Sequence, residues 1–144
     1  MYSALEVARF IIDYCRKNGL LMSNLKLQKV LYFIQAEFLV RNGEPCFFER
    51  IEAWPFGPVV SNVYHEYKTF GSSNIYSNLS NFYDIAEEDR NIIKDIVNAC
   101  NRFSATQLVE LTHNQAPWKT AYNNGNRIIT NDSILNYFGE NNNG

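Results

Sequence analysis

Apolar residues recur at the spacing of an α-helix along most of this chain. The first such segment follows Ser3 and Glu6, which match the Ser-x-x-Glu pattern of a capped helix N-terminus. It ends before Gly19, a residue type that often stops helices because it tolerates a left-handed backbone. We therefore predict a helix over residues 4 to 18.

The second segment is apolar on two sides. The two faces consist of Leu27, Val30, Leu31, Ile34 and Phe38, and of Leu25, Tyr32, Ala36 and Leu39. Ser23 can cap this helix, which reaches Asn42. A helix that is apolar on both faces is normally sandwiched between other elements, so we predict that it is the central helix. Lys29 interrupts the second face, and we expect it either to extend its charge to the surface or to pair with Glu52.

Alternating residues follow in "CFFERIEAW", residues 46 to 54, and predict a short strand. The β-branched stretch "RIIT", residues 127 to 130, is its expected partner. Pro55 tends to end the strand, Gly57 permits a turn, and Pro58 suits the first position of a helix. The junction is thus expected to convert strand into helix within four residues.

The remaining chain predicts further helices and one loop. The third helix should stop at Gly71, and residues 72 to 83 are Ser/Asn-rich without a clear period, so we expect a mobile loop there. The last helix should end before Gly139. The later helices are expected to begin at Asp84, Ser104, Pro117 and Thr130, the first two with capping boxes completed by Glu87 and Gln107.

These elements predict a mainly α (α+β) fold, a compact bundle of about six to seven helices around a central helix, with a small two-stranded β element. The chain has 144 residues, of which 46% are hydrophobic, and this is enough for one buried core. We expect a single domain over residues 1 to 139 and a polar tail over residues 140 to 144.

Charge and cysteine usage narrow the range of partners. The formal net charge is -2 and no Lys/Arg cluster is present, so direct binding to nucleic acid is not expected. Cys15, Cys46 and Cys100 are widely separated and predict buried, reduced thiols without a disulfide or metal site. The start has no basic leader and no apolar run spans a bilayer, so we expect a cytoplasmic protein without membrane contact.

The sequence lacks the motifs of the common enzyme classes, and we expect no catalytic residue, metal or cofactor. Glu49 and Glu52 could form an acid–base pair, but strand alternation would place them on opposite faces. His65 is expected to be solvated, and His113 to cap a helix or to pack on Trp118.

Two long stretches resemble a known family. "LKLQKVLYFIQAEFLVRNGEPCFFERIEAWPFGPVVSNVYHEYKTFG" and "SATQLVELTHNQAPWKTA" are similar to the SocA-like antitoxins, or Panacea domain, of bacteria and their prophages, which are labelled phage-associated proteins. The motif residues are Leu27, Lys29, Leu31 and Tyr32, then Glu52, Ala53, Trp54, Gly57, Pro58, Val59 and Tyr64, then His113, Pro117 and Trp118.

The resemblance implies a mostly helical domain that neutralises a toxin encoded beside it by direct, non-catalytic protein binding. In one branch of the family the antitoxin is an adaptor that delivers its toxin to an ATP-dependent protease. Two alternatives stay open: a prophage protein that binds a host defence or replication factor, and a small hydrolase or transferase that uses Lys29, Glu52 and His113. We expect a monomer or a weak homodimer.

Partner contacts are expected near the second and third helices and the loop at 72 to 83. The candidate partner-binding residues are Lys29, Tyr32, Glu52, Trp54, Tyr64, Tyr67 and Phe70, and the candidate structural residues are Gly57, Pro58, His113, Pro117 and Trp118. Tyr67 and Phe70 are predicted to be exposed, because Val60, Val63 and Tyr64 suffice for packing. Trp54 is predicted to be largely buried.

Overall fold

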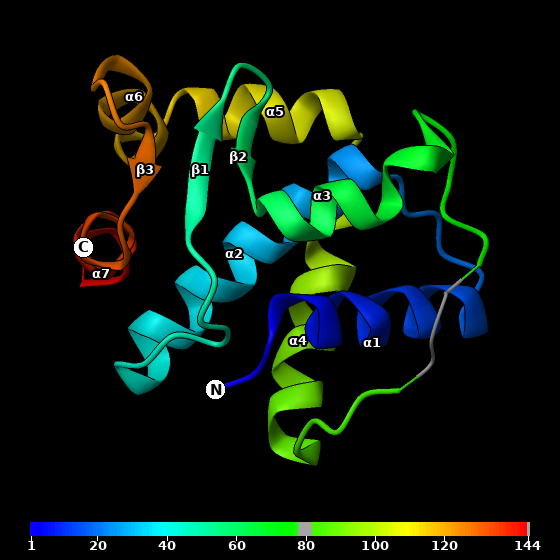
Figure 1. Ribbon diagram of the computed structural model, residues 1–144. Coiled ribbons are helices and arrows are strands. Elements are labelled where there is room, and N and C mark those ends of the chain that lie inside the picture. Colours follow the sequence, from blue (N-terminus) through cyan, green and yellow to red (C-terminus); the bar gives the residue numbers. More distant parts are fainter. Residues whose placement is uncertain (78–81, 144) are drawn as a thin grey trace.

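The computed structural model describes residues 1–77 and 82–143 and has a mainly helical fold with a small sheet (Figure 1). This confirms the predicted fold class. The elements are α1 (Ala4–Lys17), α2 (Asn24–Asn42), β1 (Ile51–Trp54), β2 (Gly57–Val59), α3 (Ser61–Tyr67), the 3-10 turn η1 (Lys68–Phe70), α4 (Glu87–Cys100), α5 (Ala105–His113), α6 (Ala116–Asn123), β3 (Ile128–Ile129) and α7 (Asn131–Asn143).

Helix α2 is the central element, as its two apolar faces predict. It contacts α1, α3, α4, α5, α7 and β2 and runs through the middle of the molecule (Figure 1). Ser23 caps its N-terminus by accepting a hydrogen bond from the Lys26 N–H at 3.2 Å. Gly43 ends the helix in a left-handed conformation with φ of 72°.

The capping residues place most helix starts correctly. The Ser104 hydroxyl accepts from the Gln107 N–H and the Gln107 side chain accepts from the Ser104 N–H, which completes the predicted capping box of α5. The capping box at Asp84 is a wrong prediction, because α4 begins at Glu87. The Asp84 N–H donates instead to the Glu6 carboxylate of α1, at 2.7 Å.

The last helix differs from its expected end. The Thr130 hydroxyl accepts from the Ser133 N–H, as predicted for its start, but α7 continues through Gly139 to Asn143. A glycine inside a helix costs only about 1 kcal/mol, so it does not always stop one. The division between a domain and a tail after residue 139 stays a prediction.

The sheet has three strands in the order β2-β1-β3, all antiparallel. Ile51 lies opposite Ile129, so the predicted pairing with residues 127 to 130 is confirmed. The strand itself is shorter than expected, because it begins at Ile51.

Sequence reasoning missed strand β2, and the predicted strand-to-helix junction is wrong. Residues Trp54 and Gly57 face each other and close a hairpin, and α3 begins only at Ser61. Pro58 lies in β2, opposite Ala53, and not at the start of a helix. A strand accepts proline at the sheet edge, where its missing N–H breaks no ladder, and β2 is an edge strand.

The core is lined by residues from every α-helix, and the three cysteines are free and buried, as predicted. Of the expected loop at 72 to 83, residues 78–81 lie outside the described residues. Its flanks are packed: Ile75 is buried and its N–H donates to the Met22 carbonyl at 2.8 Å, and the Tyr83 hydroxyl donates to Asp13. Within residues 1–77 and 82–143, no helix has both the length and the apolarity needed to cross a membrane.

Candidate protein-binding site

A stripe of buried polar side chains on α2 holds the irregular segment that follows it. The side-chain oxygen of Gln35 accepts from the N–H groups of Cys46 and Phe47, at 2.8 and 3.2 Å, and its side-chain nitrogen donates to the Phe47 carbonyl at 3.0 Å. Buried backbone groups need such partners, because an unpaired one costs free energy. The segment therefore runs across the central helix without forming regular structure.

Two turns earlier, the same stripe fixes the start of α3. The side-chain oxygen of Gln28 accepts from the Val60 N–H at 2.9 Å, and its nitrogen donates to Asn24 at 2.9 Å. The Asn24 side chain in turn donates to the Tyr64 carbonyl at 3.0 Å. Asn24, Gln28 and Gln35 lie on one face at helical spacing, a signal that could have been found in the sequence.

Lys29 anchors the hairpin. Its side chain is 0% exposed, and Nζ donates to the Pro58 carbonyl at 3.0 Å. Burial lowers its pKa from 10.5 to about 7. Both expectations for Lys29 are wrong. Its side chain does not reach the surface, and the Glu52 carboxylate accepts instead from the Trp54 indole N–H at 2.9 Å and from Arg50 at 3.2 Å.

Gly57 makes room for this lysine. Its φ is +111°, a conformation that other residues rarely adopt. A Cβ at this position would lie 2.4 Å from Cε of Lys29 and 3.1 Å from Oγ1 of Thr112. Both the backbone conformation and the available space thus require glycine.

The segment that follows His113 also contacts α2 and the hairpin. The Tyr32 hydroxyl donates to Gln115 at 2.7 Å, and the Trp118 indole N–H donates to the Trp54 carbonyl at 2.8 Å. The ring of His113 stacks on Trp118 with centroids 4.0 Å apart, which confirms the predicted packing. Three segments that are distant in sequence therefore meet around the hairpin.

Four rings gather at the surface where the hairpin meets α3. The Trp54 ring centroid lies 5.7 Å from that of Phe56, 5.0 Å from that of Tyr64 and 6.4 Å from that of His65. Trp54, Phe56 and Tyr64 are half-buried, and His65 is exposed, as predicted. Most of the Trp54 side chain is covered, as predicted, and the remainder lies at the surface. We call these four residues the aromatic cluster.

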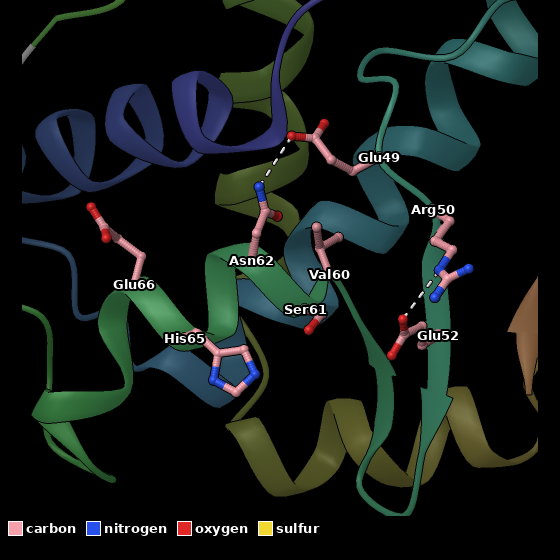
Figure 2. A pocket seen from close by; sticks show the side chains of 8 residues that line it. All are labelled: Glu49, Arg50, Glu52, Val60, Ser61, Asn62, His65 and Glu66. Atoms are coloured by element: carbon pink, nitrogen blue, oxygen red, sulfur yellow. Dashed lines mark hydrogen bonds and ion pairs between the residues drawn. The ribbon is translucent and has the colours of Figure 1, made fainter.

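An open cavity of about 720 Å³ lies beside the aromatic cluster (Figure 2). One side is formed by β1 and the residues just before it, and the other by α3. Its lining residues are Glu49, Arg50, Glu52, Val60, Ser61, Asn62, His65 and Glu66. Glu49 and Glu52 share this cavity, so their predicted placement on opposite strand faces is wrong. Glu49 precedes β1, and strand alternation does not reach it.

Two of the cavity's carboxylates are oriented by neighbouring donors. Glu49 accepts from the Ala4 N–H at 2.8 Å and from the Asn62 amide at 3.3 Å, and Glu52 accepts from Trp54 and Arg50. Figure 2 shows the contacts of Glu49 with Asn62 and of Arg50 with Glu52. The described residues contain no group of three or more metal-ligating side chains that could hold an ion.

Several predicted partner-binding residues lie in the interior. Lys29 and Tyr32 are 0% exposed and Tyr67 is 1% exposed, so none of them can contact a partner directly in this conformation. The prediction that Tyr67 is exposed is wrong; burial raises its pKa to about 12. Phe70 is half-buried, with its ring 5.0 Å from that of Tyr76.

The residues of the aromatic cluster come from the hairpin and from α3. Phe56 and His65 were not predicted as site residues. Phe56 carries a signal in the sequence, because a large aromatic side chain at the tip of a turn is only partly covered by the fold. Pro117 is buried near the N-terminus of α6, a structural position that agrees with its type.

The structure combines a helical core, a pinned hairpin, and a surface on which aromatic rings lie beside a charged cavity. Aromatic side chains are enriched at protein interfaces. Residues 27–119 match the family model described as "Antitoxin SocA-like, Panacea domain", and the chain belongs to this family. The matched range contains all three segments that meet around the hairpin.

A curated relative extends the match. The chain is 34% identical to "Antitoxin SocA" of Caulobacter vibrioides (strain NA1000 / CB15N) over an alignment of 132 residues, and the match covers 83% of this chain and 70% of that protein. The comparison with solved structures gave no match.

Proposed function

We propose that this protein is an antitoxin that neutralises a toxic protein, encoded beside it, by direct binding and without catalysis. Its membership of the SocA-like family supports the role. The observation that carries the proposal is the half-exposed aromatic cluster of Trp54, Phe56, Tyr64 and His65, next to the charged cavity. Aromatic side chains of this kind dominate the binding energy of protein interfaces.

The anchoring beneath the cluster favours binding. Gln28 and Lys29 hold the backbone of Val60 and Pro58, so the hairpin and α3 keep one position relative to the central helix. A preorganised surface loses less conformational entropy when a partner binds, which leaves more of the interaction energy for affinity.

The contacts of the candidate catalytic residues speak against a hydrolase or transferase. Lys29 is fully buried on the Pro58 carbonyl, Glu52 is engaged by an indole and a guanidinium, and His113 stacks on Trp118. A nucleophile must reach its substrate and an oriented base, and the buried amine reaches neither from this position.

The proposal is tested by co-expression with the product of the adjoining gene. The double charge reversal Glu66→Lys with Lys68→Glu keeps the net charge and changes two residues next to the aromatic cluster: Glu66 lines the cavity together with His65, and Lys68 lines a second hollow with Phe56 and Tyr64. We expect weaker rescue of growth with a nearly unchanged melting temperature, because surface substitutions usually change stability by about 0.5 kcal/mol or less. The matched control is Glu110→Lys with Lys119→Glu, two exposed residues of α5 and α6, which should rescue fully.

Each outcome separates the alternatives. Full rescue by the Glu66/Lys68 variant would exclude this face, and the absence of any toxic neighbour would favour binding to a host factor. A toxin whose level falls in the presence of the antitoxin, in a protease-dependent manner, would indicate the adaptor role. A toxin that stays abundant but inactive would indicate neutralisation by binding alone.

A further inference from the structure

We propose that the cavity between β1 and α3 receives an arginine side chain of the partner protein. This inference rests on the proposed function and adds the chemistry by which the partner is recognised. The cavity, of about 720 Å³, is large enough to take a whole side chain and is open to the surface. It adjoins the aromatic cluster through His65, which belongs to both.

The charges in the cavity are unbalanced. Three carboxylates line it, against one guanidinium, that of Arg50. Figure 2 shows that Glu49 and Glu52 come from the β1 side of the cavity and Glu66 from α3. Such complementarity determines which partner binds and how fast it associates.

Within the protein itself, a guanidinium already binds a carboxylate of this cavity, that of Arg50 to Glu52. Its Nε donates to Glu52 at 3.2 Å, while the Arg50 side chain remains 67% exposed. An exposed ion pair of this kind contributes little to stability and is readily exchanged. A partner's arginine can therefore displace Arg50 from Glu52 at small cost.

The cavity favours arginine over lysine. A guanidinium is planar, donates two parallel hydrogen bonds to a carboxylate, and stacks on aromatic rings. The lining offers both kinds of contact: the Glu52 carboxylate on the β1 side and, on α3, the exposed ring of His65, whose centroid is 5.5 Å from that of Tyr64. The ammonium group of a lysine would interact with the carboxylates but would not stack on the His65 ring.

A titration with a small probe tests this without any toxin. N-acetyl-arginine N-methylamide is added to the ¹⁵N-labelled protein, and amide shifts are followed by NMR. We expect shifts that concentrate at Asn62, His65 and Glu66, and binding about fivefold or more tighter than that of the neutral citrulline analogue, because a charge-assisted hydrogen bond is roughly twice as strong as a neutral one. The lysine analogue should bind more weakly than arginine.

Isosteric variants locate the interaction. The triple variant Glu49→Gln, Glu52→Gln and Glu66→Gln keeps acceptor oxygens for the Ala4 N–H and the Trp54 indole, so the fold should persist while arginine binding weakens about fivefold or more. The control removes three exposed carboxylates elsewhere, with the same change in net charge, and should bind arginine like the natural protein. Its substitutions are Glu44→Gln, Glu88→Gln and Glu110→Gln.

Arg50→Gln provides a second variant at an exposed position, which does not depend on the triple variant folding. It should tighten arginine binding, because it removes the internal competitor. Weaker binding by Arg50→Gln, equal shifts with the citrulline analogue, or no shifts in the cavity would overturn the inference. Arginine binding without any rescue by co-expression would contradict the antitoxin role alone, and rescue without arginine binding would contradict this inference alone.

Discussion

Lys29 is the residue on which the hairpin depends. A lysine that is fully buried with one carbonyl partner loses its hydration, and this favours the neutral amine. Its pKa accordingly falls from 10.5 to about 7. The Lys29 amine thus serves as a hydrogen-bond donor to Pro58 and not as half of an ion pair.

This burial makes stability depend on pH. Between pH 7 and 10.5 the unfolded chain keeps the lysine proton and the folded chain has lost it, so unfolding takes up a proton. The free energy of unfolding should therefore rise from pH 7 to 9, by up to about 1.4 kcal/mol per pH unit. Urea unfolding at several pH values measures this.

The control variant is Lys29→Met, which keeps the volume without the amine and should remove this rise. The comparison stays below pH 9 because burial raises the pKa of Cys15 and Cys100 to about 11, and buried neutral thiols make stability fall once the unfolded thiols ionise. Equal pH slopes for the natural protein and the variant would show that Lys29 is charged in the folded state.

Gly57 gives a second prediction for a single residue. Gly57→Ala should lower the free energy of unfolding by roughly 3 kcal/mol or more, because it adds strain at φ of +111° and a Cβ 2.4 Å from the Lys29 side chain. Thermal or urea unfolding measures the loss. Gly125→Ala is the control: a Cβ there has no neighbour within 4 Å, and the change should stay within about 0.5 kcal/mol. Comparable effects at both positions would contradict the tight fit of Gly57 against Lys29.

At the scale of elements, the buried polar side chains of α2 explain how the irregular segment after this helix can lie in the core without forming a strand. Gln35 satisfies two N–H groups and one carbonyl of the segment after the helix. Gln35→Leu should therefore cost roughly 2 to 5 kcal/mol, because buried backbone groups lose their partners. Glu37→Leu, which removes a surface ion pair with Arg41 in the same helix, should cost about 1 kcal/mol or less. A small loss for Gln35→Leu in urea unfolding would mean that these groups find other partners.

The elements also show what the sequence could predict. Helices with local capping signals, such as those after Ser23 and Ser104, were predicted close to their observed starts, because capping involves neighbouring residues. The capping box predicted at Asp84 does not form, because the Asp84 N–H donates to Glu6, a residue far away in the sequence. Strand β2 was missed because Pro58 suits both a helix start and an edge strand, and only the pairing with β1 decides between them.

Only some of the predicted partner-binding residues lie at the surface, because burial, like strand pairing, depends on contacts with distant parts of the chain. Glu52, Trp54 and Tyr64 reach the surface, as a partner-binding role requires. Tyr67 does not, because α3 starts at Ser61 and turns this side chain into the core. Helical spacing identifies residues that share a face but does not say which face is covered, and that depends on contacts with distant elements.

At the scale of the whole molecule, the central helix gathers three distant segments into one platform. α2 supplies Gln28 and Lys29, the hairpin supplies Trp54, and the α5–α6 segment supplies Trp118, whose indole holds the Trp54 carbonyl. The buried motif residues therefore support the surface indirectly, by fixing the hairpin that carries the aromatic cluster. A toxin is then expected to meet a preformed surface, with little rearrangement on binding.

The most direct test is a calorimetric titration of the purified protein against the purified product of its adjoining gene. Direct neutralisation predicts a complex with a Kd of about 1 μM or tighter. It also predicts binding at least about tenfold weaker for Glu66→Lys with Lys68→Glu, a loss of roughly 1.4 kcal/mol, and unchanged binding for Glu110→Lys with Lys119→Glu. Two results would contradict neutralisation through this face: rescue of growth by this protein without binding to the toxic gene product, or equal binding of that product to both variants.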